Sequence, residues 1–288
     1  MNITSKSRIL GVIGDPVAHS FSPLMHNAAI AAIGEDYAYV AFHVLPENVG
    51  QAVNGMRALG IRGLNVTIPH KQTVMEYLDR ISEEALAVGA VNTISLEDGD
   101  LVGYNTDVYG LSTALERVAG LQQFPECCVV LGAGGAARAA VYALGTRQEV
   151  RTVTVLNRTL ARAESLVRDM EKITGKPMTA AVLEEETPLA HFADAGLVVN
   201  ATSLGMYPHI EGSPLSSEKA LHSGTVLYDT VFNPLQTRLM SQFQSVGASA
   251  YGGLDMLVYQ GARSFQIWTG IEPSSDVMKQ AIVGRFQS

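Results

Sequence analysis

The chain has 288 residues, of which 47% are hydrophobic and 17% are charged, and its formal net charge is −8 at pH 7. This length and composition predict a well-buried core in one large or two medium-sized domains. Because the chain is acidic and has no basic stripe, we do not expect it to bind nucleic acid, and no apolar run reaches the roughly 18 residues of a membrane-spanning helix.

The only cysteines, Cys127 and Cys128, are neighbours in an apolar segment that is typical of a buried strand. Neighbours on a strand point to opposite faces, so the two thiols should neither pair with each other nor share a metal ion. We expect them to be small core residues in a reducing compartment. The polar segment from Met1 to Arg8 lacks the apolar stretch of a signal peptide. We therefore expect a cytoplasmic protein without a metal site.

Apolar and turn-forming segments alternate over the first 70 residues and predict the order β-α-β-α-β with a parallel sheet. Strands are expected at residues 8–14, 37–44 and 65–68. Helices are expected after Pro23 and Pro46, and Ser22 should cap the first of them. Ser20 and Ser22 also suit a carboxylate ligand, because hydroxyl donors, N–H donors and the helix dipole meet at such a helix start.

The third of these strands leads to Lys71. Val66 and Ile68 are expected to be buried, and Pro69 should stop the strand because it has no N–H to donate. Lys71 then follows a strand end, where open α/β sheets usually build their sites. It is a candidate proton donor or carboxylate partner, and the alternative is a solvated loop lysine. One helix should follow, with an apolar face of Val74, Leu78, Ile81 and Ala85.

A hairpin with polar ends is predicted after residue 89. Asp98 and Gly99 form its turn, Asn92 lies on its first strand, and Asn105 and Asp107 end its second strand. Each of the last three residues could be a turn former or a helix cap, and Asp107 could cap a helix over residues 108–118. Their convergence at one sheet edge nevertheless predicts a polar site.

A second pattern begins at residue 128, where a strand, a glycine-rich turn and a helix precede another strand at residues 152–156. In this context, the motif G-x-G-x-x-G/A predicts a dinucleotide-binding loop. Gly132 makes the tight turn, Gly134 lets the backbone approach the pyrophosphate, and Ala137 allows the helix to pack closely on the strand.

The end of the next strand predicts which dinucleotide is bound. NAD sites usually carry an acidic residue there, whereas this chain has Asn157, Arg158 and Thr159, with Arg162 one turn later. Two guanidinium groups, a hydroxyl and a helix N-terminus suit a dianionic 2′-phosphate. We therefore expect NADP(H) rather than NAD(H), and the alternative is a solvated helix start.

The remaining segments predict strands at 196–203, 225–232 and 249–251, an amphipathic helix at 254–268 and a last helix at 277–286. Gln260 lies among apolar neighbours on the amphipathic helix. A buried glutamine needs hydrogen-bond partners, which are either backbone groups or a polyhydroxylated ligand.

These motifs together resemble the shikimate dehydrogenase family over nearly the whole chain. Individually, only the heptad that ends in Lys71 and the segment that ends in Asp107 are specific, but the whole set in this order is very specific. The resembling segments are residues 14–23, 65–71, 89–93, 103–107, 132–136, 157–159, 200–206 and 253–260.

The resemblance implies an α/β fold with two open α/β domains and a cleft between them. The substrate-binding and catalytic domain, with a mainly parallel sheet, would comprise residues 1–106 and 253–288. The Rossmann-type NADP-binding domain would comprise residues 107–252. The last helices would return to the first domain, which would bring Gln260 to the site.

The resemblance also implies the roles of individual residues. Lys71 and Asp107 would form the catalytic pair, and Ser20 and Ser22 would bind the substrate carboxylate. The ring hydroxyls would bind Thr67, Asn92, Asp107 and Gln260. The expected contacts with NADP(H) are Gly132, Ala133, Gly134, Gly135, Ala136, Asn157, Arg158, Thr159, Arg162, Val231 and Gly253.

The implied activity is the reversible, NADPH-dependent reduction of 3-dehydroshikimate to shikimate, in the pathway to chorismate and the aromatic amino acids. The alternatives are a dehydrogenase that uses quinate or NAD, and a nucleotide-sensing protein that keeps the fold without turnover. The presence of Lys71 and Asp107 disfavours the nucleotide-sensing protein. A homodimer is the default expectation for an enzyme of this size.

Two positions depart from the family pattern. Phe232 stands where the family often has tyrosine, so a phenol hydroxyl near the substrate is missing. Arg238 stands where the family often has proline. Substrate choice therefore stays open between shikimate and quinate.

Overall fold

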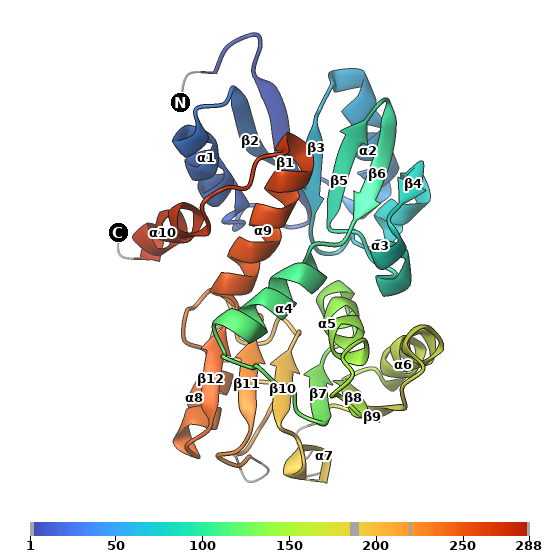
Figure 1. Cartoon of the computed structure of the whole chain (residues 1–288), viewed down its shortest axis with the longest axis vertical. Coiled ribbons are helices and arrows are strands. Elements are labelled where there is room, and N and C mark those ends of the chain that lie inside the picture. The colour runs from blue at the N-terminus through green and yellow to red at the C-terminus, as the bar shows by residue number, and fades with distance from the viewer. Residues whose placement is uncertain (1–2, 185–189, 219–220, 287–288) are drawn as a thin grey trace. The chain divides into compact units, whose positions relative to one another are not determined.

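The computed structural model of the chain describes residues 3–184, 190–218 and 221–286. The chain divides into two compact units, one formed by Met1–Gly110 with Val258–Ser288 and the other by Leu111–Leu257. Each unit contains an open sheet with helices beside it (Figure 1). The second unit is therefore an insertion in the sequence of the first.

The first unit is built on a six-stranded mixed sheet with the order β2-β1-β3-β5-β6-β4. The pairs β1–β2, β1–β3 and β4–β6 are parallel, and β5 is antiparallel to both of its neighbours. Its elements up to the insertion are β1 (Arg8–Gly14), α1 (Ser22–Ile33), β2 (Tyr37–His43), η1 (Pro46–Asn48), α2 (Val49–Leu59), β3 (Gly63–Val66), η2 (Thr73–Tyr77), β4 (Arg80–Ile81), α3 (Glu83–Val88), β5 (Thr93–Glu97), β6 (Asp100–Tyr104) and the start of α4 (Asp107–Arg117). After the insertion, the unit ends with most of α9 (Leu254–Thr269) and with α10 (Ser275–Phe286), which packs beside α1 (Figure 1).

The predicted β-α-β-α-β order of the first 70 residues is confirmed, and its causes are local. Gly34 and Gly60 end α1 and α2 in the left-handed conformation, with φ of 73° and 63°. On α2, Val49, Val53 and Met56 recur at helical spacing and are buried in the core of this unit.

Two expectations for the segment around Lys71 are wrong. β3 ends at Val66, and Ile68 is 60% exposed. The single helix expected after Lys71 is divided into η2, β4 and α3. The division arises because β4 pairs with β6, and because the Ser82 side chain starts α3 anew by accepting a backbone N–H at 3.3 Å.

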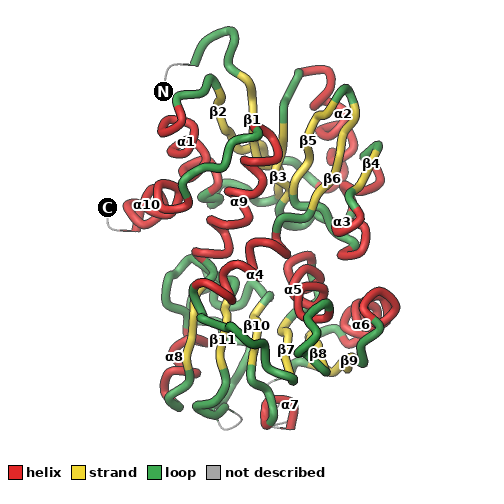
Figure 2. The backbone as a smooth tube through the Cα atoms, in the orientation of Figure 1, coloured by secondary structure: helices red, strands yellow, loops and turns green. Residues whose placement is uncertain are grey.

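The second unit contains a fully parallel sheet with the order β12-β11-β10-β7-β8-β9 (Figure 1). Figure 2 shows helices in red beside its yellow strands. Its elements are β7 (Cys127–Leu131), α5 (Gly135–Gly145), β8 (Thr152–Asn157), α6 (Leu160–Thr174), β9 (Met178–Val182), α7 (Ala190–Ala193), β10 (Leu197–Asn200), β11 (Val226–Asp229), α8 (Arg238–Ser245) and β12 (Ser249–Gly252). The predicted βαβ unit is confirmed as β7-α5-β8. β9 was not predicted, because this edge strand buries only Met178 fully and lacks an apolar run.

Helix α9 is anchored in the first unit by Trp268, which is fully buried. The indole N–H donates to the carbonyl oxygen of Ile94 at 2.9 Å. The ring also lies against Gly63 of β3, where a Cβ atom would come within 2.6 Å of the indole Cε2. Glycine is therefore required at position 63 because the indole occupies the space of a side chain.

Gly63→Ala should lower the free energy of unfolding by about 1–3 kcal/mol, the usual effect of overpacking in a core. Gly55→Ala is a matched control, because Gly55 lies inside α2 with open space around its Cβ position. Alanine is favoured over glycine in a helix interior by about 0.5–1 kcal/mol, so the control should be neutral or stabilising. Thermal unfolding midpoints of both variants would measure this difference, and equal midpoints would contradict the packing described here.

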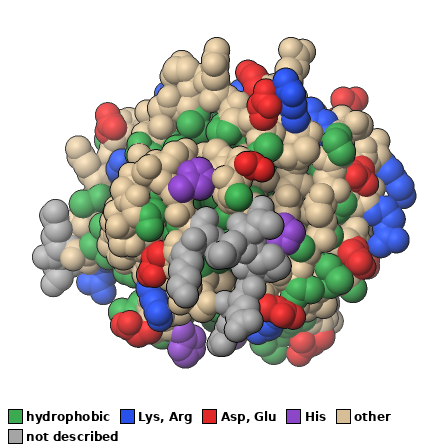
Figure 3. Space-filling view, turned by 90° about the horizontal axis from the view of Figure 1, so that it is seen from below, with side chains coloured by type: hydrophobic (Ala, Val, Ile, Leu, Met, Phe, Trp, Pro, Cys, Tyr) green, Lys and Arg blue, Asp and Glu red, His purple; other side chains and the backbone are tan. Residues whose placement is uncertain are grey.

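On the face shown in Figure 3, Lys and Arg side chains lie close to acidic side chains in several places. The described residues therefore form no continuous basic stripe on this face. No helix among the described residues is both long enough and apolar enough to cross a membrane.

Candidate active site

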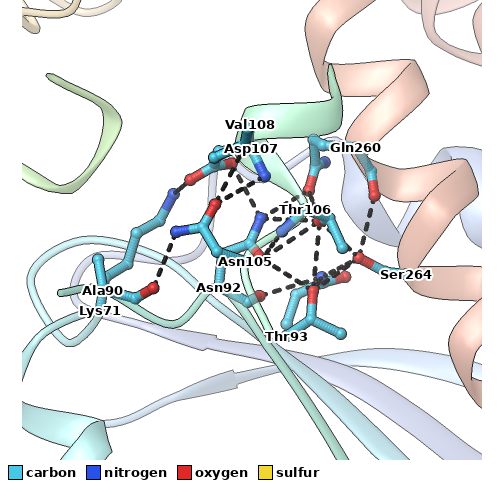
Figure 4. A network of polar contacts seen from close by, with 11 residues as sticks. Lys71, Ala90, Asn92, Thr93, Asn105, Thr106, Asp107, Val108, Gln260 and Ser264 are labelled. Atoms are coloured by element: carbon cyan, nitrogen blue, oxygen red, sulfur yellow. Dashed lines mark hydrogen bonds and ion pairs between the residues drawn. The ribbon is translucent and has the colours of Figure 1, made fainter. Parts of the chain in front are cut away.

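Lys71 and Asp107 form an ion pair beside the ends of β3 and β6 (Figure 4). Lys71 Nζ lies 2.6 Å from Asp107 Oδ2, and the two side chains are only 16% and 6% exposed. A pair shielded from solvent in this way is screened less than a surface pair. Lys71 is therefore not the solvated loop lysine of the alternative interpretation.

Asn105 positions the start of α4 and leaves the Asp107 carboxylate free for Lys71. Asn105 Oδ1 accepts the backbone N–H groups of Asp107 and Val108 at 3.0 and 3.4 Å, and its Nδ2 donates to the Ala90 carbonyl at 2.8 Å. These bonds satisfy helix-start donors that would otherwise need a cap. Asp107 lies in the first turn of α4 and does not have to cap it.

Asn92 lies directly before β5, whereas it was expected on the strand itself. Because β5 is antiparallel to β3 and β6, its start lies at the edge where those strands end. Asn92 Oδ1 accepts the backbone N–H of Thr106 at 2.7 Å, which fixes the orientation of the amide. Its Nδ2 donates to Asp107 Oδ1 at 2.9 Å. Asn92 thus orients the carboxylate whose other oxygen holds Lys71.

Gln260 joins this group from helix α9 and is buried, as predicted. Its Oε1 accepts from Asn92 Nδ2 at 3.3 Å and from the Thr106 hydroxyl at 3.5 Å. The fold therefore brings Lys71, Asn92, Asp107 and Gln260 into one hydrogen-bonded group (Figure 4).

Ser22 does not cap α1, contrary to expectation. Ser22 is the first residue of the helix, and the capping position is held by Phe21 without a side-chain bond. The Ser20 hydroxyl accepts the Ser22 N–H at 3.3 Å. The Ser22 hydroxyl instead forms a hydrogen bond with Tyr39. Burial raises the pKa of the Tyr39 phenol well above its usual value, and the bond with Ser22 partly opposes that shift.

Thr67 is half-buried after β3, and its N–H donates to the Ile13 carbonyl.

Four buried polar residues beside the site were missed by the sequence analysis. They are Asn65, Thr93, Thr106 and Ser264, and they link the Tyr39 hydroxyl to Asn92 and Gln260. Asn65 interrupts an apolar strand, and Ser264 lies one turn after Gln260 on the apolar face of α9. Polar residues at core positions were the available signal, because buried polar groups need partners.

The glycine-rich turn of the second unit follows β7, where the strand order reverses between β7–β8 and β7–β10. Gly132 has a φ of 108°, and a Cβ there would lie 3.0 Å from the Ala201 carbonyl oxygen. Gly134 precedes α5 with open space around its Cβ position, and the buried Ala137 packs α5 on the sheet. The α5 N-terminus therefore offers backbone N–H groups to an anion, as a pyrophosphate requires.

The end of β8 carries exposed positive charge beside a second helix start. Arg158, Thr159 and Arg162 are exposed at the start of α6, and Thr159 makes no side-chain capping bond. Asn157 Nδ2 donates to the Thr159 carbonyl at 2.8 Å, which shapes the turn. The donor set suits a phosphate that is present in NADP(H) and absent from NAD(H).

Val231 and Gly253, also expected near the cofactor, meet through the Gly253 N–H, which donates to the Val231 carbonyl at 3.0 Å. Gly253 lies so close to the Thr230 backbone that a side chain could not be accommodated. The Val231 N–H donates to the buried Asp229, and burial raises the pKa of that carboxyl. No group of three or more His, Cys, Asp or Glu side chains among the described residues is arranged to hold a metal ion.

Comparisons with known proteins return one family along the chain. Family models for the shikimate dehydrogenase substrate binding domain, for shikimate / quinate 5-dehydrogenase and for the shikimate 5'-dehydrogenase C-terminal domain match residues 12–94, 116–207 and 253–283. A shikimate dehydrogenase (NADP(+)) of Methanocaldococcus jannaschii is 44% identical over 284 residues, which is 99% of both chains. One of Symbiobacterium thermophilum is 47% identical and covers 97% of this chain and 95% of its own.

A solved structure of a shikimate dehydrogenase in complex with NADP+ has a TM-score of 0.91 with this chain at 43% identity, and the match covers 99% of this chain and 97% of that one. Sequence and fold therefore agree over nearly the full length, as the motif order had suggested. The chain belongs to the shikimate dehydrogenase family.

Proposed function

We propose that the chain reversibly reduces 3-dehydroshikimate to shikimate with NADPH, in the pathway to chorismate and the aromatic amino acids. Relatives named for NADP-dependent shikimate dehydrogenase extend over almost its full length. The observation that carries the proposal is the shielded contact of 2.6 Å between Lys71 and Asp107. Interconversion of a ketone and an alcohol requires one proton to be handled at the oxygen, and this pair supplies a group for that task.

Lys71 donates the proton to the C3 oxygen during reduction and takes it back during oxidation. Asp107 holds the lysine through one oxygen and is itself held by Asn92 through the other. This preorganisation favours the reaction because the donor does not have to be reoriented in the transition state. NADP(H), when bound, supplies or accepts the hydride.

We further propose that Ser20 and Ser22 bind the substrate carboxylate, with Thr67, Asn92, Asp107 and Gln260 as partners of the ring hydroxyls. Asn92 and Gln260 are 2% and 8% exposed and already hydrogen-bond to each other, which supports a shared role. Buried amide groups suit hydroxyl ligands because they offer both donors and acceptors.

For the cofactor, we propose that the pyrophosphate binds at Gly132 to Ala136 and that the 2′-phosphate binds at Asn157 to Arg162, with Val231 and Gly253 as further contacts. The open N-termini of α5 and α6 support these positions. Residues 1–106 with 253–288 would then bind the substrate, and residues 107–252 would bind NADP(H).

Initial rates on shikimate and quinate, each with NADP+ and NAD+, test the proposal. We expect the highest kcat/KM for shikimate with NADP+. A preference for quinate with NAD+ would favour the alternative dehydrogenase activity. Tight NADPH binding without turnover of either acid would favour a nucleotide-sensing protein.

The same assay on Arg158→Ala tests the cofactor assignment. A hydrogen bond to a charged group contributes about 1.5–3 kcal/mol, so kcat/KM with NADP+ should fall by roughly 10–100-fold. The value with NAD+ should change by less than about threefold, because NAD+ lacks the 2′-phosphate. Arg168→Ala is the matched control, since Arg168 is exposed farther along the same helix. Equal losses with both cofactors would contradict the assignment.

A homodimer and a cytoplasmic location complete the proposal. The homodimer is the common state of soluble enzymes of this size, and sedimentation velocity would test it. The location follows from the proposed biosynthetic activity, and fractionation of the cells would test it.

A further inference from the structure

We propose that Ser264 is a positioning residue that organises the Asn92 amide, and through it Asp107, from helix α9. The inference rests on the proposed function, because it concerns the same site. Ser264 is fully buried and faces Thr93 and Thr106 (Figure 4). It is therefore placed to act on the site through its neighbours.

The Ser264 hydroxyl has its hydrogen-bonding capacity occupied by protein groups. It donates to the Gln260 carbonyl at 3.0 Å and accepts from Asn65 Nδ2 at 3.0 Å. The hydroxyl oxygens of Thr93 and Thr106 lie 2.7 and 3.1 Å from the Ser264 oxygen. Their two O–H groups therefore compete to donate to the second lone pair of Ser264. Because a hydroxyl has one donor and two acceptor sites, none is left for a substrate.

The two threonines connect Ser264 to Asn92. Their hydroxyl oxygens lie 2.9 and 3.2 Å from Asn92 Oδ1, the acceptor that also receives the Thr106 N–H. Each threonine has a single hydroxyl proton, so the one that donates to Ser264 cannot also donate to Asn92. The Ser264 hydroxyl thereby selects which threonine hydroxyl donates to Asn92 Oδ1 beside the Thr106 N–H.

The same helix face contacts the site at two points one turn apart. Gln260 Oε1 accepts from Asn92 Nδ2 at 3.3 Å, and the same Nδ2 donates to Asp107 Oδ1 at 2.9 Å. Without the Ser264 hydroxyl, neither threonine proton is held by Ser264, and both hydroxyls can turn towards Asn92 Oδ1. The Asn92 amide then has no single fixed arrangement, and the position of Asp107 is less well defined. Loss of the Ser264 hydroxyl should therefore impair shikimate turnover and leave NADP(H) binding unchanged. The reason is that Ser264, the two threonines, Asn92 and Asp107 all belong to the first unit.

Ser264→Ala should therefore lower kcat/KM for shikimate about tenfold, equivalent to about 1.4 kcal/mol. The pH at half-maximal kcat should move by about half a unit or more, because Asp107 and Lys71 handle the proton. KM for NADP+ should stay within about twofold of the wild type. Ser264→Thr, which keeps the hydroxyl, should recover most of the activity.

Thr269→Val is the matched control. The Thr269 hydroxyl donates to the carbonyl four residues earlier on the same helix, Phe265, at 2.8 Å, so the variant removes the same kind of bond from α9 outside the site. A purely structural role for Ser264 would lower the thermal midpoint in both variants and leave both pH profiles unchanged. Wild-type kinetics in Ser264→Ala, or an equal loss of affinity for shikimate and NADP+, would overturn the inference.

Should Ser264→Ala fail to fold, Ser264→Cys answers the same question, because a thiol has nearly the same shape and only a weak S–H donor. Full activity in Ser264→Cys would overturn the inference. Failure of the wild type itself to oxidise shikimate would overturn the proposed function and this inference together. A normal wild type with an unaffected Ser264→Ala would overturn the inference alone.

Discussion

Replacing Lys71 by alanine should reduce kcat for shikimate oxidation by roughly 10²–10⁴-fold, the usual contribution of a general acid or base. The reason is that Lys71 Nζ, held at 2.6 Å from Asp107, is the proposed proton donor to the C3 oxygen. The dissociation constant for NADPH should stay close to that of the wild type. Stopped-flow single turnovers and fluorescence titration with NADPH would separate the two effects.

Lys172→Ala is a suitable control, because it removes an exposed lysine of α6 outside the proposed substrate and cofactor contacts. Asp107→Asn would complement the pair of variants, since it keeps the shape of the side chain and removes the charge that holds Lys71. A kcat within about threefold of the wild type in Lys71→Ala would remove Lys71 from the chemistry.

Acidification should destabilise the protein through His26. This residue is completely buried, and burial lowers the pKa of its imidazole from 6.5 to about 3. Below pH 6.5 the unfolded chain therefore binds a proton that the folded chain excludes. The stabilisation is fully present above pH 6.5 and is lost as the pH falls towards 3, at up to about 1.4 kcal/mol per pH unit.

The surroundings explain why the folded protein keeps His26 neutral. Its ring stacks on Tyr39 with centroids 4.2 Å apart and has Phe265 and Trp268 nearby, at 6.1 and 5.6 Å. Neither ring nitrogen has a hydrogen-bond partner among the described residues. An imidazolium placed there would be desolvated without compensation, which is costly in an apolar environment.

His26→Phe keeps an aromatic ring in the stack and removes the titrating group. Between pH 7.5 and 4.5 the wild type should lose roughly 2–3 kcal/mol more unfolding free energy than this variant. Urea denaturation at the two pH values would measure the difference, and His209→Gln, at an exposed position, should behave like the wild type. If His26→Phe were as acid-sensitive as the wild type, His26 would not be the source of the effect.

Much of the fold was predictable because its signals are local. Glycines at Gly34 and Gly60, the turn at Asp98, and the glycine-rich loop after β7 each fix a conformation within a few residues. The parallel order of the second unit follows from alternating strand and helix patterns. β4 and β9 were not predicted, because a two-residue strand and a half-exposed edge strand carry almost no hydrophobic periodicity.

The candidate site was predictable only in part. Lys71 and Asp107 could be named from the segments around them, but the bonds that hold them depend on contacts distant in sequence. Asn65 and Ser264 are 199 positions apart and still share a hydrogen bond. A sequence shows that a polar residue stands at a core position, but it does not show which partner satisfies it. That Asn92 reaches the site from the start of a strand could not be predicted for a related reason, since the antiparallel direction of β5 is a property of the whole sheet.

The insertion of Leu111–Leu257 into the first unit has a consequence for synthesis on the ribosome. The inserted unit is contiguous and emerges whole, whereas the first sheet must wait for roughly 150 further residues before Trp268 and Gln260 are made. At about 5–20 residues per second, that delay is on the order of 10–30 s. During this delay, the nascent sheet exposes the space beside Gly63 that the Trp268 indole will fill. The inserted unit should therefore complete its fold first and the catalytic unit last.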